Sequence, residues 1–446
     1  MNNFARNTVY LLATVLFALA IPLFATQSTA ATLTIVYSGP LRGELEPCGC
    51  TIDTDLGGIR RLATAIDALR SKDPALVLIS TGGLLATTQP AHEVTNRFIL
   101  KGLAALDYDA IGLRWADLIY GTGPLSADGL PWVASNWQAA QPDFSVEPNR
   151  LIERDGQRIA FLQWLTSDES PHQGQPLAQQ PVHRDISRLE YRLRELKSQS
   201  VLTILGVTGD VRAIQHLTPG LVDILLLGSP DEQVANPEHH DNTITLKAGT
   251  RGQRLGLLKL VSDLANTWSV QSHKVITLDE SVTDARRLDS WYAQYERELV
   301  KDYRERARRA KENRAEGGYA GDAVCEVCHA KQKARWLQTD HGHAFQSLTK
   351  VSKQFDANCI GCHVVGFGKP GGFYSAQAKP DLRNVGCEAC HGPAKDHQRH
   401  GGTKPLEPVT NAVCRKCHNA EHSPTFDPDA YRARIIHWPP PESPQK

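Results

Sequence analysis

The 446-residue sequence predicts an α/β layered domain, then a long helix, then a mainly α-helical and irregular domain rich in cysteine and histidine. Three observations carry this prediction. Short apolar runs alternate with helical patterns up to about residue 275, and a charged amphipathic stretch follows them. Residues 321–446 then hold eight of the ten Cys and ten of the seventeen His. The domain boundaries that we expect are 32–278, 279–316 and 317–446.

The first 31 residues have the pattern of a secretory signal peptide. Arg6 supplies a cationic start, an apolar run covers 9–21, and small residues precede a cleavage point after Ala30 or Ala31. The run is shorter than the roughly 20 residues that a membrane span needs, so we expect cleavage and no stable membrane span in the mature protein. An uncleaved anchor is the alternative. Both outcomes predict a periplasmic protein, or an extracellular one if it crosses an outer membrane.

The segment 32–278 predicts strands that are buried on both faces. Its apolar runs are short, rich in leucine and β-branched residues, and bounded by Gly, Pro or Asp. Helical patterns at 58–69 and 96–106 separate several of them. The expected strands are 33–37, 76–80, 110–113, 132–135, 159–165, 201–207 and 224–227.

One amphipathic helix is expected in the linker 279–316. Residues 283–316 contain no Gly or Pro and carry ten Arg and Lys against eight Asp and Glu, which is typical of a solvated face. Apolar residues recur on the other side at three- and four-residue spacing, namely Leu288, Trp291, Tyr292, Tyr295, Leu299 and Tyr303. The whole chain has 49 Lys and Arg against 49 Asp and Glu, which argues against a nucleic-acid partner.

The last domain repeats the pattern Cys-x-x-Cys-His four times. Two thiols three positions apart can add to the two vinyl groups of one haem, and the next residue can then ligate its iron. A zinc ribbon would not need a His after each pair, and disulfides would leave the four His unexplained. We therefore expect four covalently attached haems c, which would also fill a segment poor in aliphatic residues. The motif residues are Cys325, Cys328 and His329; Cys359, Cys362 and His363; Cys387, Cys390 and His391; and Cys414, Cys417 and His418.

Each iron needs a second axial ligand or keeps an open position. The only methionine is Met1, so a mature chain offers histidine rather than methionine, and bis-histidine ligation predicts low reduction potentials. Six histidines of the domain remain beside the motifs. We expect one of His341 and His343 to ligate, with His397, His422 and His437 as the other choices, which leaves His400 unassigned.

The last 130 residues resemble the tetrahaem cytochrome c554 family. The resemblance rests on residues 319–329, 336–345, 359–368, 384–393 and 414–422. It implies closely stacked haem pairs that pass electrons. It also allows one haem to be five-coordinate, and we favour the haem at His363 for that role.

Residues 32–262 are similar to the metallophosphoesterase domain of periplasmic 5′-nucleotidases. The similarity rests on segments 35–47, 106–121, 222–228 and 247–256, and it implies a sandwich whose loops hold two metals with Asp, His and Asn. The corresponding positions mostly carry residues that cannot ligate such metals, so we expect a scaffold or docking domain without hydrolytic activity. These positions are Pro40, Arg42, Gly82, Gly83, Trp115, Ala116, Asp117, Val207 or Thr208, and 228–231.

Two smaller features stay open. Cys48 and Cys50 lie in the loop after the first strand, and could form a reducible disulfide, hold a metal or reach a haem. His239 and His240 have polar neighbours that indicate an exposed turn rather than a metal site.

The sequence therefore predicts an electron-transfer protein rather than a hydrolase, with no catalytic residue of its own. Its expected partners are redox proteins, either other cytochromes or a quinol-linked donor. One alternative is a multihaem oxidoreductase that acts on a small nitrogen-oxide-type substrate at a five-coordinate haem. The other is residual nucleotidase or phosphoesterase activity in the first domain.

Overall fold

The computed structural model describes residues 31–47, 55–87, 92–138, 144–172, 175, 180–228, 236–263, 267–312, 317–377, 379–419, 423 and 425–437. Cys48, Cys50, His422 and all but the last residue of the expected signal peptide lie outside these ranges. Within the described ranges, no helix combines the length and the apolar character that a membrane span requires.

The first sheet has the order β12-β11-β1-β2-β3-β4. The strands β1 to β4 are parallel neighbours, with Ile35 opposite Val77, whereas β11 runs antiparallel to β1 and pairs with β12 in a hairpin. The strands are β1 (Thr32–Ser38), β2 (Val77–Ser80), β3 (Ala110–Gly112), β4 (Trp132–Val133), β11 (Arg254–Ser262) and β12 (Trp268–Thr277).

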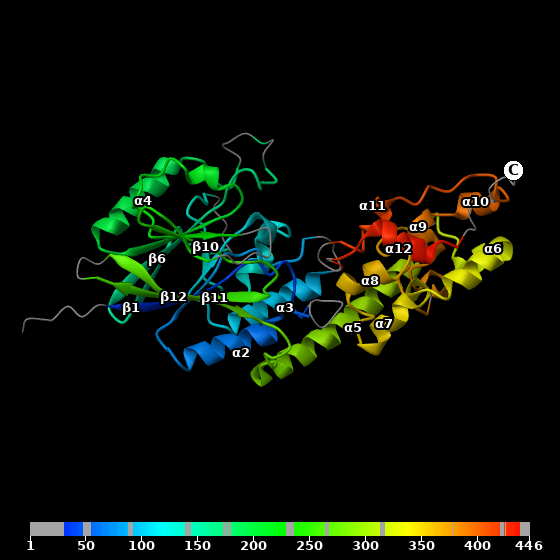
Figure 1. Cartoon of the computed structure of the whole chain (residues 1–446), viewed down its shortest axis with the longest axis horizontal. Coiled ribbons are helices and arrows are strands. Elements are labelled where there is room, and N and C mark those ends of the chain that lie inside the picture. Colours follow the sequence, from blue (N-terminus) through cyan, green and yellow to red (C-terminus); the bar gives the residue numbers. More distant parts are fainter. Residues whose placement is uncertain are drawn as a thin grey trace, which may run out of the picture.

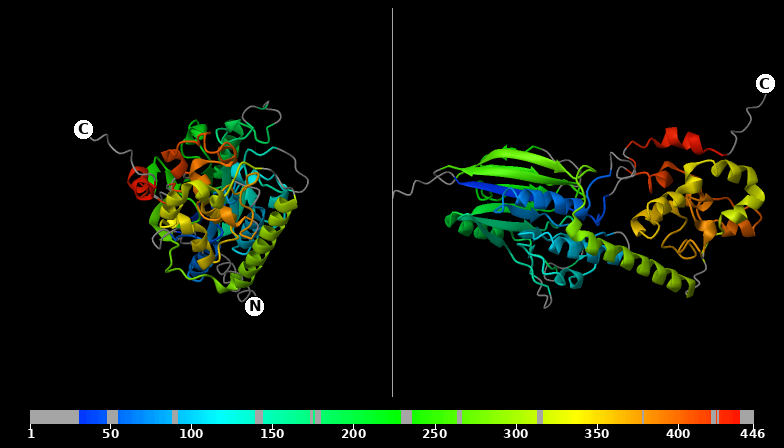
Figure 2. Two further views of the ribbon diagram at one scale, coloured as in Figure 1. Left: turned by 90° about the vertical axis from the view of Figure 1, so that its right-hand side faces the viewer. Right: turned by 90° about the horizontal axis from the view of Figure 1, so that it is seen from below.

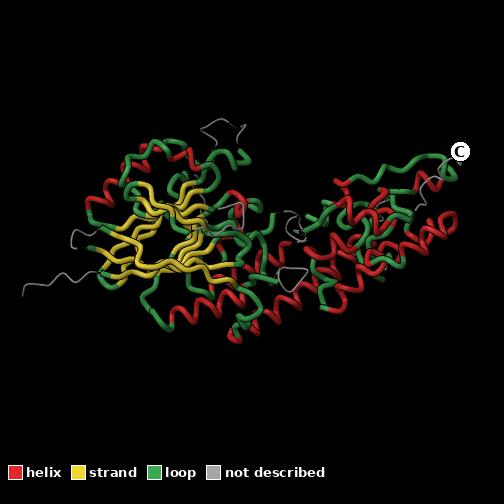
Figure 3. The backbone as a smooth tube through the Cα atoms, viewed as in Figure 1, coloured by secondary structure: helices red, strands yellow, loops and turns green. Residues whose placement is uncertain are grey.

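The second sheet has the order β5-β6-β7-β8-β10-β9, and it faces the first sheet as the other layer of a sandwich (Figure 3). One buried cluster joins the two inner faces, with Ile35 and Val77 from the first sheet and Phe161 and Ile204 from the second. The strands are β5 (Arg150–Arg154), β6 (Gln157–Trp164), β7 (Leu202–Val207), β8 (Ile224–Leu227), β9 (Glu238–His240) and β10 (Thr243–Lys247).

Helices cover the outer faces of the sandwich. The helices α2 (Ile59–Arg70) and α3 (Glu93–Ala104) pack on the first sheet, and α4 (Ile186–Ser198) packs on the second. Short 3-10 turns lie at η3 (Trp115–Leu118), η4 (Gly123–Ser126) and η6 (Val211–Ile214). The predicted α/β layered class is confirmed. His239 and His240 form the exposed edge strand β9 instead of the expected turn.

The long helix α5 (Asp289–Glu312) follows the 3-10 turn η7 (Arg286–Leu288) and extends from the sandwich to the C-terminal segment (Figures 1 and 2). Its first half packs on α3, where Gly102 leaves room for Trp291: a Cβ there would lie 2.7 Å from the Trp291 ring. Its second half buries Tyr303 in the small core of the C-terminal segment. The charged linker is therefore a helix shared by two parts of the molecule.

The C-terminal segment consists of short helices joined by irregular stretches, as predicted. One small cluster, which includes Phe345, Ile360 and Phe373, is the apolar core among its described residues. The elements are α6 (Asp322–Trp336), η8 (Asp340–His343), α7 (Ala344–Lys350), α8 (Ala357–His363), η9 (Pro380–Leu382), α9 (Cys387–His391), α10 (Lys395–Arg399), α11 (Asn411–Cys414) and α12 (Pro428–Ile435).

Candidate haem-binding sites

Each Cys-x-x-Cys-His motif lies on or beside a short helix. Motif 1 (325–329) lies in α6, motif 2 (359–363) ends α8, motif 3 (387–391) is α9, and motif 4 (414–418) begins at the last residue of α11. One helical turn brings residues three apart to the same face, so the two thiols of a motif can reach one ligand. In motif 1 the helix is interrupted at His329, whose φ is −118° and ψ 38°.

The four motifs are neighbours in space in the order 1, 3, 4, 2. The thiols of Cys325 and Cys387 are in hydrogen-bonding contact, which joins motifs 1 and 3. The thiols of Cys362 and Cys417 make the same contact between motifs 2 and 4. Motifs 3 and 4 are also close to each other. Burial is the main cause of the raised pKa of the Cys390 thiol, and the nearby Cys414 of motif 4 adds to it.

Two carboxylates that sequence reasoning did not single out hold motifs 1 and 3 together. Glu388, buried inside motif 3, accepts hydrogen bonds from the backbone N–H groups of Ala320 and Gly321 at 2.8 Å, just before α6. Asp322, at the start of α6, accepts one from the N–H of Cys387 at 3.0 Å. The sequence signal was weak, because Glu388 occupies a variable position of the motif.

The structure brings three motif histidines close to a second histidine. His329 lies opposite His397, with ring centroids 6.3 Å apart and planes 22° apart. His418 lies opposite His341, at 5.9 Å and 55°. His391 lies opposite His437, at 6.0 Å and 84°.

These separations have the size expected for two imidazoles on opposite sides of one metal ion. A metal–imidazole bond is about 2 Å and a ring centre lies roughly 1 Å behind its nitrogen, so the two centroids should be roughly 6 Å apart. Burial lowers the pKa of His341, His391 and His418, and so favours the neutral imidazole that a metal requires.

Hydrogen bonds at Nδ1 hold two of these rings. The Nδ1 atom of His397 lies 2.6 Å from the Lys404 carbonyl oxygen, and that of His437 lies 3.0 Å from the Ile435 carbonyl oxygen. Such contacts fix the ring and leave Nε2 for a metal, as is usual for metal-bound histidine. The residues therefore fit bis-histidine haem at motifs 1, 3 and 4.

Motif 2 differs from the others. His363 directs Nδ1 to the Ala344 carbonyl oxygen at 2.6 Å, and among the described residues no imidazole lies opposite its ring as in the three pairs. His343 is exposed and places Nε2 2.8 Å from the Leu337 carbonyl oxygen. His400 is exposed and places Nδ1 2.7 Å from the Asp396 carbonyl oxygen. The structure thus brings His341, His397 and His437 to motif histidines, but not His343.

In the sandwich domain, the positions expected to hold metals surround the side chain of Arg114. A Cβ added at Gly228 would lie 2.5 Å from the Nη1 atom of Arg114. A Cβ added at Gly83 would lie 3.0 Å from the Cδ atom of Arg114 and 3.0 Å from the Cβ atom of Pro40. The guanidinium pairs with Glu169 at 3.2 Å. A cation therefore lies between loops that follow β2 and β8.

The one carboxylate that remains at the expected ligand positions described here is used by the backbone. Asp117 is fully buried and accepts hydrogen bonds from the N–H groups of Gly83 at 2.8 Å, Leu84 at 2.6 Å and Arg114 at 3.1 Å. In the described part of the chain, no group of three or more His, Cys, Asp or Glu could hold a metal ion.

Comparison with known proteins agrees with both halves of this description. The family model described as cytochrome c554 and c-prime matches residues 324–392, which include motifs 1, 2 and 3. Cytochrome c-554 of Nitrosomonas europaea is 38% identical over 106 residues, which cover 20% of this chain and 45% of that protein. The chain thus spans about half the length of this relative. Over this part, the C-terminal segment is similar to cytochrome c554.

Two solved structures share the fold of the sandwich domain. The NAD nucleotidase of Haemophilus influenzae has 13% identity and a TM-score of 0.52, and the match covers 60% of each chain. The 5′-nucleotidase precursor of Thermus thermophilus has 17% identity and a TM-score of 0.51, covering 61% of this chain and 59% of that one. At this identity the likeness shows the metallophosphoesterase fold and not the activity.

Proposed function

We propose that this protein is an exported c-type cytochrome that conducts electrons through four covalently bound haems, three of them with bis-histidine ligation. The observation that carries the proposal is the set of three histidine pairs, whose ring centroids are 5.9 to 6.3 Å apart. Each pair joins one motif histidine to one histidine from elsewhere in the segment, as one iron between two axial ligands requires.

The assignment of ligands follows from these pairs. His329 and His397 hold the haem of motif 1, His391 and His437 that of motif 3, and His418 and His341 that of motif 4. The haems supply one-electron exchange, and the surrounding chain sets their potentials. Ligation by two histidines without methionine gives low potentials.

The order of the motifs supports a continuous electron path. The thiol contacts link motif 1 to 3 and motif 2 to 4, and motifs 3 and 4 adjoin. The helices α6 and α10, which hold the ligands of motif 1, lie at the end far from the sandwich, whereas α8 with motif 2 lies beside α5 and faces the sandwich (Figure 1). Electrons from a redox partner, another cytochrome or a quinol-linked donor, enter at one end and leave at the other.

The sandwich domain acts as a docking scaffold in this proposal. The support is the Arg114 guanidinium among the former metal loops, because a cation there repels metal ions and cannot ligate them. Incubation with a nucleotide or a generic phosphate ester and added manganese should release no phosphate. Release that a chelator abolishes would favour residual phosphoesterase activity instead.

A second function is favoured by one observation, the different surroundings of His363. With no imidazole opposite it among the described residues, its haem would offer an open position for a small nitrogen-oxide-type substrate; His422, outside those residues, is the other candidate ligand. Carbon monoxide or nitric oxide should shift the spectrum of the reduced protein if the position is open. An unchanged spectrum would contradict this second function and leave electron transfer as the proposed function.

The direct test of the main proposal is the number of haems per chain together with the spin state of each iron. We expect four haems, with at least three low-spin irons. A smaller number, or zinc in place of iron, would contradict the proposal. Detection of the mature protein in a periplasmic fraction, beginning at Ala31 or Thr32, would test the proposed export.

A further inference from the structure

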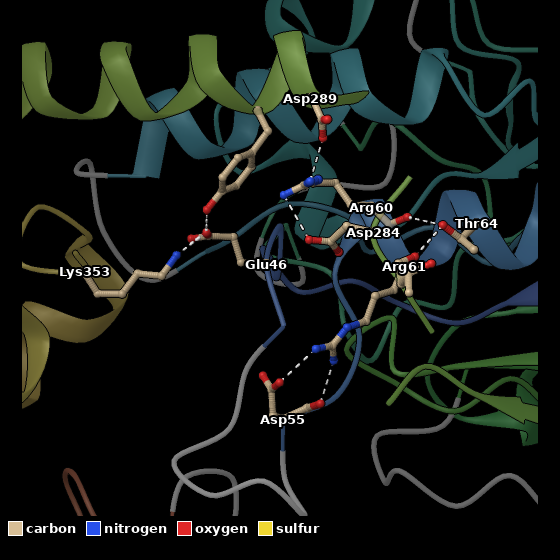
Figure 4. A network of polar contacts seen from close by, with 10 residues as sticks. Glu46, Asp55, Arg60, Arg61, Thr64, Asp284, Asp289 and Lys353 are labelled. Atoms are coloured by element: carbon tan, nitrogen blue, oxygen red, sulfur yellow. Dashed lines mark hydrogen bonds and ion pairs between the residues drawn. The ribbon is translucent and has the colours of Figure 1, made fainter. Parts of the chain in front are cut away.

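The junction between the sandwich domain and motif 2 contains an ion pair and a hydrogen bond that share one carboxylate. Glu46, in the loop after β1, accepts a hydrogen bond from the hydroxyl of Tyr292 on α5 and forms an ion pair with Lys353, three residues before Asp356. Figure 4 shows Lys353 reaching Glu46 from the C-terminal segment. The Glu46 side chain is 14% exposed and that of Lys353 30%. We call Glu46, Tyr292, Lys353 and Asp356 the junction cluster.

Asp356 connects the junction cluster to motif 2. It is the N-cap of α8, with a carboxylate that accepts a hydrogen bond from the N–H of Asn358 at 2.9 Å and a carbonyl that accepts from the N–H of Cys359 at 3.2 Å. The helix α8 has seven residues, so about 10 Å separates its two ends. A charge at Asp356 therefore lies close enough to motif 2 to interact with a charge there.

Charged side chains from several elements face the junction. Three carboxylates, of Glu46, Asp302 and Asp356, face two cations, of Lys353 and Arg306, and the Arg306 Nε atom donates to Asp302 at 2.7 Å. Tyr292 and Tyr295 on α5 are neutral, because burial and the nearby carboxylates raise their pKa. His92, at the start of α3, is buried, and burial and Arg306 lower its pKa. On α5, Glu296, Arg297, Lys301 and Arg304 also line the cavity beside Glu46 and Lys353.

Asp356 is the carboxyl group best placed to take a proton. It is 7% exposed. Burial, and then the charge of Glu46, raise the pKa of Asp356 to about 6, although its bond from Asn358 and the cations Lys353 and Arg306 act in the opposite direction. Burial alone would lower the pKa of Lys353, but the charge and the hydrogen bond of Glu46, together with Tyr292 and Asp356, raise it, so Lys353 keeps its charge.

We propose that Asp356 takes up one proton when the haem of motif 2 receives an electron, so that the junction is a proton-binding site linked to electron transfer. The electron comes from the redox partner and the proton from solvent, and the Asp356 carboxylate becomes a carboxylic acid. The added negative charge is thereby cancelled. This inference rests on the proposed haem at Cys359, Cys362 and His363.

The sandwich domain has a defined part in this site. Glu46 belongs to that domain, and its negative charge raises the proton affinity of Asp356 across the junction. A domain without hydrolytic chemistry would in this way set the pH range in which the cytochrome couples electrons to protons.

The test is a spectroelectrochemical titration of each haem in the full-length, haem-loaded protein at several pH values from about 5 to about 9, a range around the pKa of a raised carboxyl group. One midpoint potential should fall with pH by up to about 59 mV per unit over part of this range, because a tenfold change in a one-electron equilibrium is 59 mV. Asp356→Asn should abolish this slope and keep the helix cap, since Asn caps helices as well as Asp.

Two further variants complete the experiment. Asp427→Asn is the matched control: Asp427 is the N-cap of α12 and accepts from the N–H of Asp429 and Ala430, so the same substitution there should leave the slope unchanged. Glu46→Gln should move the sloping region to lower pH, because it removes the charge that raises the proton affinity of Asp356.

Each outcome bears on one claim. Four haems with a slope that persists in Asp356→Asn would assign the proton to another group, such as a haem propionate, and overturn this inference alone. Four haems with no pH-dependent potential would overturn it as well. A haem count that shows motif 2 empty would instead contradict the proposed function on which it rests.

Discussion

The sandwich domain and the C-terminal segment are held together in different ways. The sandwich buries large aliphatic and aromatic side chains in three clusters, one of them between the two sheets. The C-terminal segment has one small cluster among its described residues, and its helices are as short as four or five residues. Isolated helices of that length are unstable in water. Four covalently bound haems would supply the missing interior. We therefore expect the C-terminal segment to be destabilised by loss of a haem, and the sandwich by loss of a core side chain.

The largest effect is expected from the loss of a central attachment site. Motif 3 adjoins both motif 1 and motif 4, so replacing Cys387 and Cys390 by Ala should remove its haem and unfold much of the C-terminal segment. Limited proteolysis with haem quantification should show a resistant sandwich fragment of unchanged size and a degraded C-terminal segment. A segment that stays resistant with three haems would show that its protein core is sufficient.

A core truncation in the sandwich should destabilise the sandwich and leave the haem content of the C-terminal segment unchanged. Phe161 is fully buried between the two sheets, and Phe161→Ala should lower the free energy of unfolding of this domain by about 3–5 kcal/mol through the cavity it leaves. Urea denaturation followed by far-ultraviolet circular dichroism measures the loss. The haem content should not change, and a parallel loss of haem would contradict the separate origins of stability.

The junction should show a pH-dependent effect of intermediate size. The pKa of Asp356 is about 6 in the fold, above its ordinary value, so its contribution to stability is full below about pH 4 and is lost as pH rises through 6. The free energy of unfolding of Asp356→Asn, relative to that of the unmodified protein, should therefore rise by up to about 2–3 kcal/mol between about pH 4 and about pH 7. Urea denaturation of both proteins at the two pH values measures this. A constant difference would place Asp356 at an ordinary pKa.

A single distal ligand should have the most local effect. His397→Ala removes the partner of His329 and should convert one iron from low to high spin, with little change in fold. His400→Ala is the control, since His400 lies three residues further on and is exposed, with its Nδ1 atom 2.7 Å from the Asp396 carbonyl oxygen. Electron paramagnetic resonance of the oxidised proteins distinguishes them. If the spectrum of His397→Ala equals that of the unmodified protein, His397 is not an axial ligand.

Sequence reasoning recovered the elements that a repeated pattern specifies. The strands β1, β2, β7 and β8 and the helix α5 follow from apolar periodicity, and they lie close to the expected ranges. The edge strand β12 was not singled out, because alternate side chains face solvent and no apolar run marks it.

Sequence spacing could not choose between His341 and His343, which lie only two residues apart. In the structure the short turn η8 places His341 against His418, while His343 contacts the Leu337 backbone oxygen. The junction cluster could not be predicted from the sequence either, because Glu46 and Lys353 are separated by 307 positions and no local pattern links them.

The central claim is that three irons lie between histidine pairs of defined orientation. Electron paramagnetic resonance of the fully oxidised, full-length protein tests it, because the shape of a low-spin signal depends on the angle between the two imidazole planes. The pairs at 22°, 55° and 84° predict three distinct low-spin signals, with the most anisotropic from His391 and His437. Fewer than three low-spin irons would contradict this account.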